Sequence, residues 1–362
     1  MFKACKISVA AIMVLSVCAC STKPVGPNLN DCSVAEIIQR AEEEKYINSV
    51  AMPDTWANWS GMWEVMRARH GLAHTDLDMN SVEELSLFAA EKNGATKDIG
   101  DVGIEYGKRA KNMGVTQPYR TSYWEEIPAW AKDDQGHWIA SYMGTMAFLI
   151  NDNLVDKPPS SWNDLLYGDY KISIGDVMSS AQAQYAVVAA AIAMGGSVSR
   201  LQPGIDFWKN IAQQGRLDRG DSSAVRVVQN QVAVACLWDF NALNYRENAQ
   251  KTREDSSFTA CIPKDGTIRT AYATIINAYA PHPHAAALVR EYILSDEGQI
   301  QLAKGYATPI RKVEIPEEVK SRMIPPEQYV NVQDAADVTT EITERVMKLW
   351  KEQVLPFVNS KK

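Results

Sequence analysis

The sequence predicts an α/β fold with two lobes. Segments typical of strands and of helices alternate along the first third of the chain, which indicates a parallel sheet with helical crossovers. The chain is also longer than one hydrophobic core usually serves, since about 340 residues remain once an N-terminal leader is set aside. Two apolar strands, at residues 142–150 and 271–280, are expected to cross between the lobes and form a hinge.

The first lobe is expected to alternate strand and helix without interruption. Strands are expected at residues 46–52, 72–79 and 99–103. The helices that follow them are expected at 59–70, from 80 onward and at 104–112. The helix that begins near residue 80 carries a capping-box pattern, in which Ser81 caps the helix and Glu84 reaches back to it.

The second lobe is expected to begin with a turn and a short helix at residues 158–166. An Ala-rich helix at 181–194 follows; Ser179 and Ser180 open it and two glycines stop it. The other elements of the chain are expected at 171–177, 201–214, 223–230, 232–238, 258–262, 284–295 and 296–304, before a helical tail.

A short apolar run near the N-terminus predicts an export signal. Val17-Cys18-Ala19-Cys20, at the end of the run, resembles the cleavage box of bacterial lipoproteins. The run is shorter than the ~20 residues that a membrane span needs. We expect cleavage before Cys20, acyl chains on Cys20 and a flexible tether over residues 21–30. Because Cys18 departs from the usual box, cleavage without lipid is the alternative.

These expectations define the domains and the location of the protein. The signal peptide is 1–19, the lipid-anchored tether and N-terminal segment 20–44, the first lobe 45–142 plus 268–310, and the second lobe 143–267 plus 311–362. The mature protein is then exported, as a periplasmic or cell-surface lipoprotein anchored at Cys20.

Charge and cysteine content narrow the classes of partner. The net charge of −7, a pI near 5.4 and the absence of a basic run argue against nucleic-acid binding. Three cysteines remain beside a lipid-bearing Cys20. An oxidising compartment permits a disulfide between Cys236 and Cys261, and two free buried thiols are the alternative.

Motifs spread over nearly the whole mature chain resemble those of one family. They are DLDMNS at 76–81, EK at 91–92, DIGDVG at 98–103, PSSWNDLL at 159–166, WDFNAL at 238–243, IPKDG at 262–266, HPHAA at 282–286, LSDEGQ at 294–299 and GYATP at 305–309. In this order and spacing the chain resembles the solute-binding proteins of ABC importers, in the branch with ferric-iron, polyamine, phosphosugar and aminoethylphosphonate binders.

The resemblance implies a type II periplasmic-binding-protein fold, with two crossing strands at the hinge and a small solute in the interlobe cleft. It implies a permease and its ATPase as partners, no cofactor and no catalysis. We expect a monomer that contacts the membrane only through its lipid anchor.

Hydroxyl groups at predicted helix starts suggest an anion subsite. Ser179 and Ser180, with Gln182, open the Ala-rich helix, and a helix N-terminus binds phosphate or carboxylate readily. Ser222 and Ser223 open another predicted helix, which is the less favoured candidate for the anion subsite. The alternative is that these serines serve only as helix caps.

Aromatic and carboxylate side chains suggest an amine subsite, which cation–π contact and charge pairing would form. Asp54, Trp56 and Asn58 follow the first strand, where strand carboxyl ends face the ligand crevice. The further candidate ligand-binding residues are Trp124, Thr145, Trp238, Asp239, Asn241 and Tyr272. The alternative for each tryptophan is packing in the core. Asp101 and Glu105 flank another strand end, where they also suit helix capping.

The motifs that are missing weigh against iron and against catalysis. The chain has no Tyr-Tyr pair, which the iron-binding relatives use, and no zinc, nucleophile-elbow or phosphate-loop motif. Combining both subsites, we expect a phosphonate or phosphorylated compound that carries an amine, such as 2-aminoethylphosphonate. A polyamine such as spermidine or putrescine is the alternative, and an anchored extracytoplasmic hydrolase is the rival class.

Overall fold

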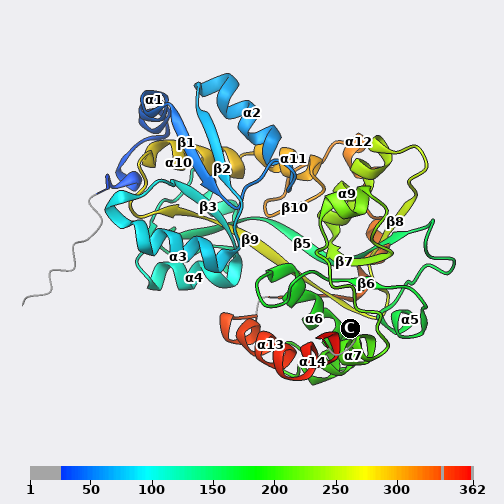
Figure 1. The fold of residues 1–362 in the computed structure, drawn as a ribbon. Coiled ribbons are helices and arrows are strands. Elements are labelled where there is room, and N and C mark those ends of the chain that lie inside the picture. Colours follow the sequence, from blue (N-terminus) through cyan, green and yellow to red (C-terminus); the bar gives the residue numbers. More distant parts are fainter. Residues whose placement is uncertain (1–25, 336–337, 360–362) are drawn as a thin grey trace, which may run out of the picture.

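The computed structural model describes residues 26–335 and 338–359, which form two lobes joined by two long strands (Figure 1). The predicted signal peptide and the lipid site at Cys20 lie outside the described residues. Among the described helices, none is long and apolar enough to cross a membrane.

The first lobe is built around a parallel core of strands, as its alternating pattern predicts. Strand β1 (Tyr46–Val50) lies between β2 (Ala73–Leu77) and β3 (Ile99–Gly103), parallel to both. The lobe also contains β4 (Thr116–Gln117) and the helices α1 (Val34–Glu44), α2 (Trp59–His70), α3 (Ser81–Glu91), α4 (Ile104–Asn112), α10 (Pro283–Leu294) and α11 (Asp296–Lys304).

The second lobe surrounds the far half of the crossing strands (Figure 1). Its strands are β6 (Ile172–Ser173), β7 (Val234–Trp238), β8 (Phe258–Cys261) and β11 (Val332–Asp334). Its helices are α5 (Trp162–Tyr167), α6 (Ala181–Ala193), α7 (Gln202–Gln213), α8 (Ala224–Val228), α9 (Asp239–Thr252), α12 (Glu317–Lys320), α13 (Thr340–Gln353) and α14 (Leu355–Asn359).

The two crossing strands are β5 (Trp138–Asn151) and β9 (Thr267–Asn277), which pair antiparallel. Strand β9 also pairs with β3 in the first lobe, while β5 pairs with β7 and β8 in the second. The short strand β10 (Thr308–Pro309) joins the edge of β5. The register between β5 and β9 shifts by one residue after Ala140, so that Tyr142 lies opposite Tyr272.

A buried guanidinium ties the loops of the first lobe to β9. Arg290 on α10 is fully buried and donates to the carbonyl oxygens of Tyr119, Gly136 and Thr274 and to the Thr274 hydroxyl. Burial lowers the pKa of Arg290 to about 9, so the group is still charged at neutral pH and its donors satisfy carbonyls that are shielded from water.

Several expectations about local structure need correction. The capping box of α3 is formed by Asn80 and Glu83, not by Ser81 and Glu84. Asn80 is the last extended residue before the helix, so the box lies one residue earlier than expected. The predicted tether ends earlier than residue 30, since Leu29 is fully buried. The strand expected at 171–177 pairs only at 172–173. Helices α1 and α9 were not expected.

The two cysteines whose pairing the sequence leaves open lie on opposite sides of β5 as free thiols. Phe148 is the register partner of Cys236 on β7 and of Cys261 on β8. Strands two positions apart in a sheet are separated by about 10 Å, beyond the ~7 Å limit between the α-carbons of a disulfide. Burial raises the pKa of both thiols, to about 11 at Cys261, which makes them unreactive.

The close packing of α6 against α7 generates a prediction about the stability of the second lobe. A β-carbon on Gly204 would lie 2.5 Å from the Val187 carbonyl oxygen and 2.6 Å from the Ala191 nitrogen. We expect Gly204→Ala to push the helices apart and to lower the free energy of unfolding by about 1–3 kcal/mol in urea titrations. Gly94→Ala, where the new methyl meets open space, is the matched control and should change stability by less than about 0.5 kcal/mol. Equal stability of the two variants would refute the tight contact.

Candidate functional site

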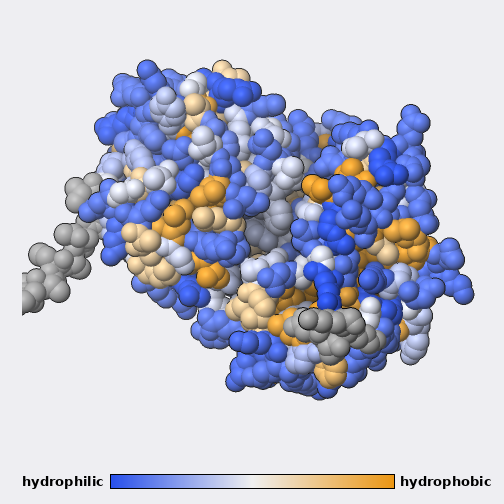
Figure 2. All heavy atoms as spheres, viewed as in Figure 1, coloured by the Kyte–Doolittle hydropathy of each residue, from blue (hydrophilic) through white to orange (hydrophobic). Residues whose placement is uncertain are grey.

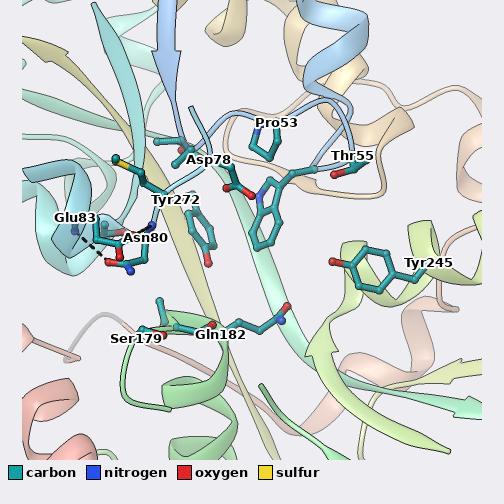
Figure 3. A pocket seen from close by; sticks show the side chains of 16 residues that line it. Pro53, Thr55, Asp78, Asn80, Glu83, Ser179, Gln182, Tyr245 and Tyr272 are labelled. Carbon is teal, nitrogen blue, oxygen red and sulfur yellow. Dashed lines mark hydrogen bonds between the residues drawn. The ribbon is translucent and has the colours of Figure 1, made fainter. Parts of the chain in front are cut away.

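A cavity of about 440 Å³ lies between the two lobes and is lined by both (Figure 3). Asp78, Asn80 and Glu83 lie on the side of the first lobe, with Ser179 and Gln182 facing them from the second. The full lining comprises Ala51, Pro53, Thr55, Trp56, Asp78, Met79, Asn80, Ser81, Glu83, Asp101, Ser179, Ser180, Ala181, Gln182, Tyr245 and Tyr272.

The first lobe builds its wall at the carboxyl ends of three parallel strands. Four lining residues between 51 and 56 follow β1, five between 78 and 83 follow β2, and Asp101 lies in the middle of β3. Carboxyl ends of parallel strands meet at one edge of a sheet, which is where ligands bind in open α/β sheets. The turn after β1 is held by the Asn58 side chain, whose amide donates to the backbone oxygen of Gln301 at 3.0 Å.

A chain of hydrogen bonds runs under this wall and ends at a carboxylate. Trp56 Nε1 donates to the Tyr142 hydroxyl at 2.6 Å, which in turn donates to Asp101 Oδ2 at 2.6 Å. Tyr142 stacks on Tyr272, with ring centroids 5.4 Å apart and planes 7° from parallel. The shift in register of β5 makes this stack, because it places both tyrosines on the same face.

Asp101 is the most deeply buried carboxyl group of the wall. The side chain is 3% exposed and its Oδ1 has no hydrogen-bond partner among the described residues. Burial raises the pKa of Asp101 well above its usual range; the Tyr142 hydroxyl opposes the shift and the Asp76 charge adds to it. Glu84 lies behind, fully buried, and burial, followed by the Asp101 charge, raises its pKa as well. A positive group at Asp101 Oδ1 would relieve this desolvation.

The second lobe contributes the N-terminal turn of α6. The hydroxyl of Ser179 donates to Asp176 Oδ2 at 2.8 Å, and the Ser180 hydroxyl accepts from the Ala183 N–H, so both hydroxyls are engaged within the turn. Gln182 Oε1 accepts from the Trp238 backbone N–H at 2.9 Å and from Asn241 Nδ2 at 3.0 Å. This leaves the Gln182 amide nitrogen as a donor at the cavity.

The structure brings together five of the residues predicted for the site. Trp56, Ser179, Ser180, Gln182 and Tyr272 all line the cavity. They come from both lobes and from β9, as the prediction of an interlobe site requires.

The other predicted residues do not line the cavity. Asp54 is exposed on the turn after β1, and Trp124 lies under the cations of Arg120 and Lys132. Trp238 is fully buried and donates from Nε1 to the Tyr272 hydroxyl at 2.9 Å, so it supports a lining residue.

Buried residues under the cavity account for the rest of the set. Asp239 Oδ1 accepts from the backbone N–H of Thr145, and Oδ2 accepts from the Tyr329 hydroxyl. Asn241 holds Gln182, and Asn58 holds the turn after β1. These side chains fix the lining residues from behind and do not reach the cavity.

Eleven lining residues were not among the predicted site residues, and four of these are ionisable: Asp78, Glu83, Asp101 and Tyr245. Asp78 directly follows β2, a strand-end position like that of the loop after β1, whereas Asp101 lies in the middle of β3, where the sequence also suited a helix cap. Tyr245 lies on α9, a helix that the sequence did not reveal. The cavity therefore holds three carboxylates, at Asp78, Glu83 and Asp101, and its lining contains no Lys, Arg or His.

The charge of Asp78 acts across the cavity on the Tyr245 hydroxyl. Burial, followed by the charges of Asp76 and Glu83, raises the pKa of Asp78. Burial and the Asp78 charge raise the pKa of Tyr245 to about 12. Among the described residues, no group of three or more metal-binding side chains is close enough to hold a metal ion.

The chain is similar to known proteins in sequence pattern and in fold. The family model of the bacterial extracellular solute-binding proteins matches residues 96–339. No curated protein matches the sequence.

Solved structures show the same fold, that of type II periplasmic binding proteins. The periplasmic binding protein AfuA from Actinobacillus pleuropneumoniae, with fructose-6-phosphate bound, is 16% identical; the match has a TM-score of 0.66 and covers 85% of this chain and 98% of that one. The spermidine/putrescine-binding protein PotD from Streptococcus pneumoniae is 16% identical, with a TM-score of 0.63 and coverage of 86% and 99%. The ferric binding protein from Campylobacter jejuni is 18% identical, with a TM-score of 0.63 and coverage of 84% and 98%.

The buried carboxyl beneath the cavity generates a prediction about pH. Burial raises the pKa of Asp239 from 3.8 to about 6. Hydrogen bonds from the Thr145 N–H, the Tyr329 hydroxyl and the Phe240 N–H lower the pKa but do not cancel the effect of burial. Between these values the folded state holds a proton that the unfolded state has released, so the unfolding free energy falls as pH rises. Relative to Asp239→Asn, the wild type should lose up to about 3 kcal/mol between pH 4 and pH 7 in urea titrations.

The matched control for this experiment is Asp54→Asn, at an exposed turn. Its stability curve should stay parallel to that of the wild type over the same pH range. Parallel curves for Asp239→Asn and the wild type would show that Asp239 does not titrate in this window.

Proposed function

We propose a cargo for this chain, which belongs to the family of bacterial extracellular solute-binding proteins and so captures a small solute for an ABC importer. The cargo is a small organic cation with at least one primary ammonium group, of the polyamine class. The observation that carries the proposal is the charge of the cavity, with three carboxylates and no basic side chain in its lining.

The unpartnered oxygen of Asp101 supplies the specific contact. An ammonium within hydrogen-bond distance of Oδ1 would gain about 4 kcal/mol of Coulomb energy at an effective dielectric constant of 20. The faces of Trp56 and Tyr272 border the same space, where aromatic rings add cation–π attraction. Asp78 and Glu83 lie further along the wall and suit a second ammonium group.

Size and position support a captured small molecule. The cavity volume of about 440 Å³ lies within the ~300–1,000 Å³ of small-molecule sites. Its walls come from both lobes, so an occupant that contacts both stabilises the closed arrangement. In the family, the closed receptor then delivers its solute to the permease.

A phosphonate that carries an amine is the second candidate cargo, favoured by one observation. The N-terminal turn of α6 faces the carboxylates across the cavity, and its dipole would attract an acidic group. A helix end contributes the equivalent of about half a positive charge, whereas three carboxylates oppose it. The balance therefore favours a cation over an anion as the cargo.

Isothermal titration calorimetry of the protein without its leader tests the cargo. We expect spermidine or putrescine to bind and Asp101→Asn to weaken that binding by about 10–100-fold, because a hydrogen bond to a charged group contributes about 1.5–3 kcal/mol. Asn retains the acceptor for the Tyr142 hydroxyl. Asp54→Asn removes an exposed carboxylate outside the cavity and should leave the affinity unchanged. Binding of 2-aminoethylphosphonate without binding of either polyamine would reverse the order of the two candidates.

A second variant, in the wall contributed by the second lobe, tests whether the cargo is positively or negatively charged there. Ser179→Asp adds a carboxylate at the N-terminal turn of α6, which should spare or tighten polyamine binding and weaken 2-aminoethylphosphonate binding. Ser179→Asn is the neutral control for the change in size. If the aspartate weakens polyamine binding more than the asparagine does, the cation is not the cargo at this wall.

A further inference from the structure

A second cavity, of about 260 Å³, opens beside the hinge and is separate from the first. We propose that it binds a small aromatic monoamine, with the ammonium on Glu105 and the ring between Trp130 and Trp138. This site does not depend on the proposed cargo of the first cavity. Its lining comprises Ile104, Glu105, Trp130, Trp138, Met143, Arg269, Thr270, Ala271, Asp334, Ala335 and Val338.

Three parts of the fold bring this lining together. Ile104 and Glu105 begin α4, directly after β3. Met143 and residues 269–271 belong to the crossing strands β5 and β9. Asp334, Ala335 and Val338 lie at and after the end of β11 in the second lobe. Figure 2 shows hydrophobic side chains on both sides of the seam between the lobes, over the region of α3 and α4 and over that of α6. The cavity therefore touches the first lobe, the hinge and the second lobe at once.

The aromatic wall depends on close approach of α4 to β5. A β-carbon on Gly107 would lie 2.6 Å from Cγ of Trp138, so only glycine lets the indole lie against the helix. Trp130, in the 3-10 turn Ala129–Ala131, keeps 50% of its surface exposed. Large exposed aromatic side chains beside an apolar hollow are typical of binding sites.

One polar atom in this apolar cavity lacks a partner. Glu105 is 9% exposed; its Oε2 accepts from the Tyr185 hydroxyl at 3.1 Å, and its Oε1 has no hydrogen-bond partner within the described residues. Burial raises the pKa of Glu105 to about 7, which its own backbone N–H and the Tyr185 hydroxyl partly oppose. The carboxyl is thus poised to ionise when a cation arrives.

The basic residue in the lining is already paired. Arg269 Nη2 lies 2.7 Å from Asp334 Oδ1, and Arg269 Nε donates to the same oxygen at 2.8 Å. Arg269 is therefore engaged with Asp334, and in this proposal the ammonium group of the occupant supplies the positive charge at Glu105. The walls are otherwise apolar, and the volume is below the ~300 Å³ at the lower end of drug-sized sites, which limits the occupant to one ring with a short amine arm.

The test uses phenethylamine, measured by calorimetry and by tryptophan fluorescence. We expect the wild type to bind it and Glu105→Gln to weaken binding at least tenfold, since the neutral amide keeps the acceptor for Tyr185 but loses the charge. Trp130→Ala should weaken binding and reduce the fluorescence response. Because Trp130 is half exposed, this variant should keep the melting temperature of the wild type, which separates a binding defect from a folding defect. 2-Phenylethanol, with a hydroxyl in place of the ammonium, should bind more weakly than phenethylamine.

Asp101→Asn separates the two cavities, because Asp101 lines the first and not the second. Phenethylamine binding should survive this substitution. Three results would overturn the proposal: no binding of phenethylamine at millimolar concentration, equal affinity of the wild type and Glu105→Gln, or binding that Asp101→Asn abolishes and Glu105→Gln spares.

Discussion

The pairing of β5 with β9 is the constraint on which both cavities depend. Each strand belongs to both lobes, so the segment where they pair is the hinge and also the shared wall of the two cavities. A one-residue shift in their register sets Tyr142 opposite Tyr272 and supplies the aromatic base of the first cavity. In an unshifted ladder Tyr142 would lie opposite Ala271. Its ring would then be on the opposite face of the sheet from Tyr272, because side chains alternate along a strand. The site thus follows from one irregular step in the sheet.

Both cavities present carboxyl groups that the fold leaves without partners. Asp101 Oδ1 and Glu105 Oε1 are buried and accept no hydrogen bond from the described residues. Unpaired buried acceptors reduce stability, and folds usually avoid them. In the two proposals made above, these are the atoms that meet the ammonium group of the occupant. By contrast, Arg290 on α10 donates to backbone carbonyls of the first lobe, and Gln182 on the facing wall of the first cavity accepts from Asn241.

Local signals predicted much of the fold. Helices α2 and α4 and strand β3 begin and end where their periodicity and caps indicate, because those signals lie within a few neighbouring residues. Helix α9 escaped prediction because buried polar residues, Asp239 and Asn241, interrupt its apolar pattern. The site was predicted only in part for a similar reason. Whether Trp56 or Trp238 reaches the cavity depends on tertiary packing, and Asp101 resembles an ordinary cap until β9 and Tyr142 cover it.

The place of β9 in the sheet also sets the order in which the chain can fold. β9 lies between β3 and β5, yet it follows β3 by more than 150 residues in the sequence. The first lobe therefore has a gap in the middle of its sheet until residue 277 has been synthesised, and the nascent chain passes through a long period with unpaired strand edges. For a member of an extracellular family, late closure of the fold is an advantage, since a chain that has not yet folded can still be threaded across a membrane.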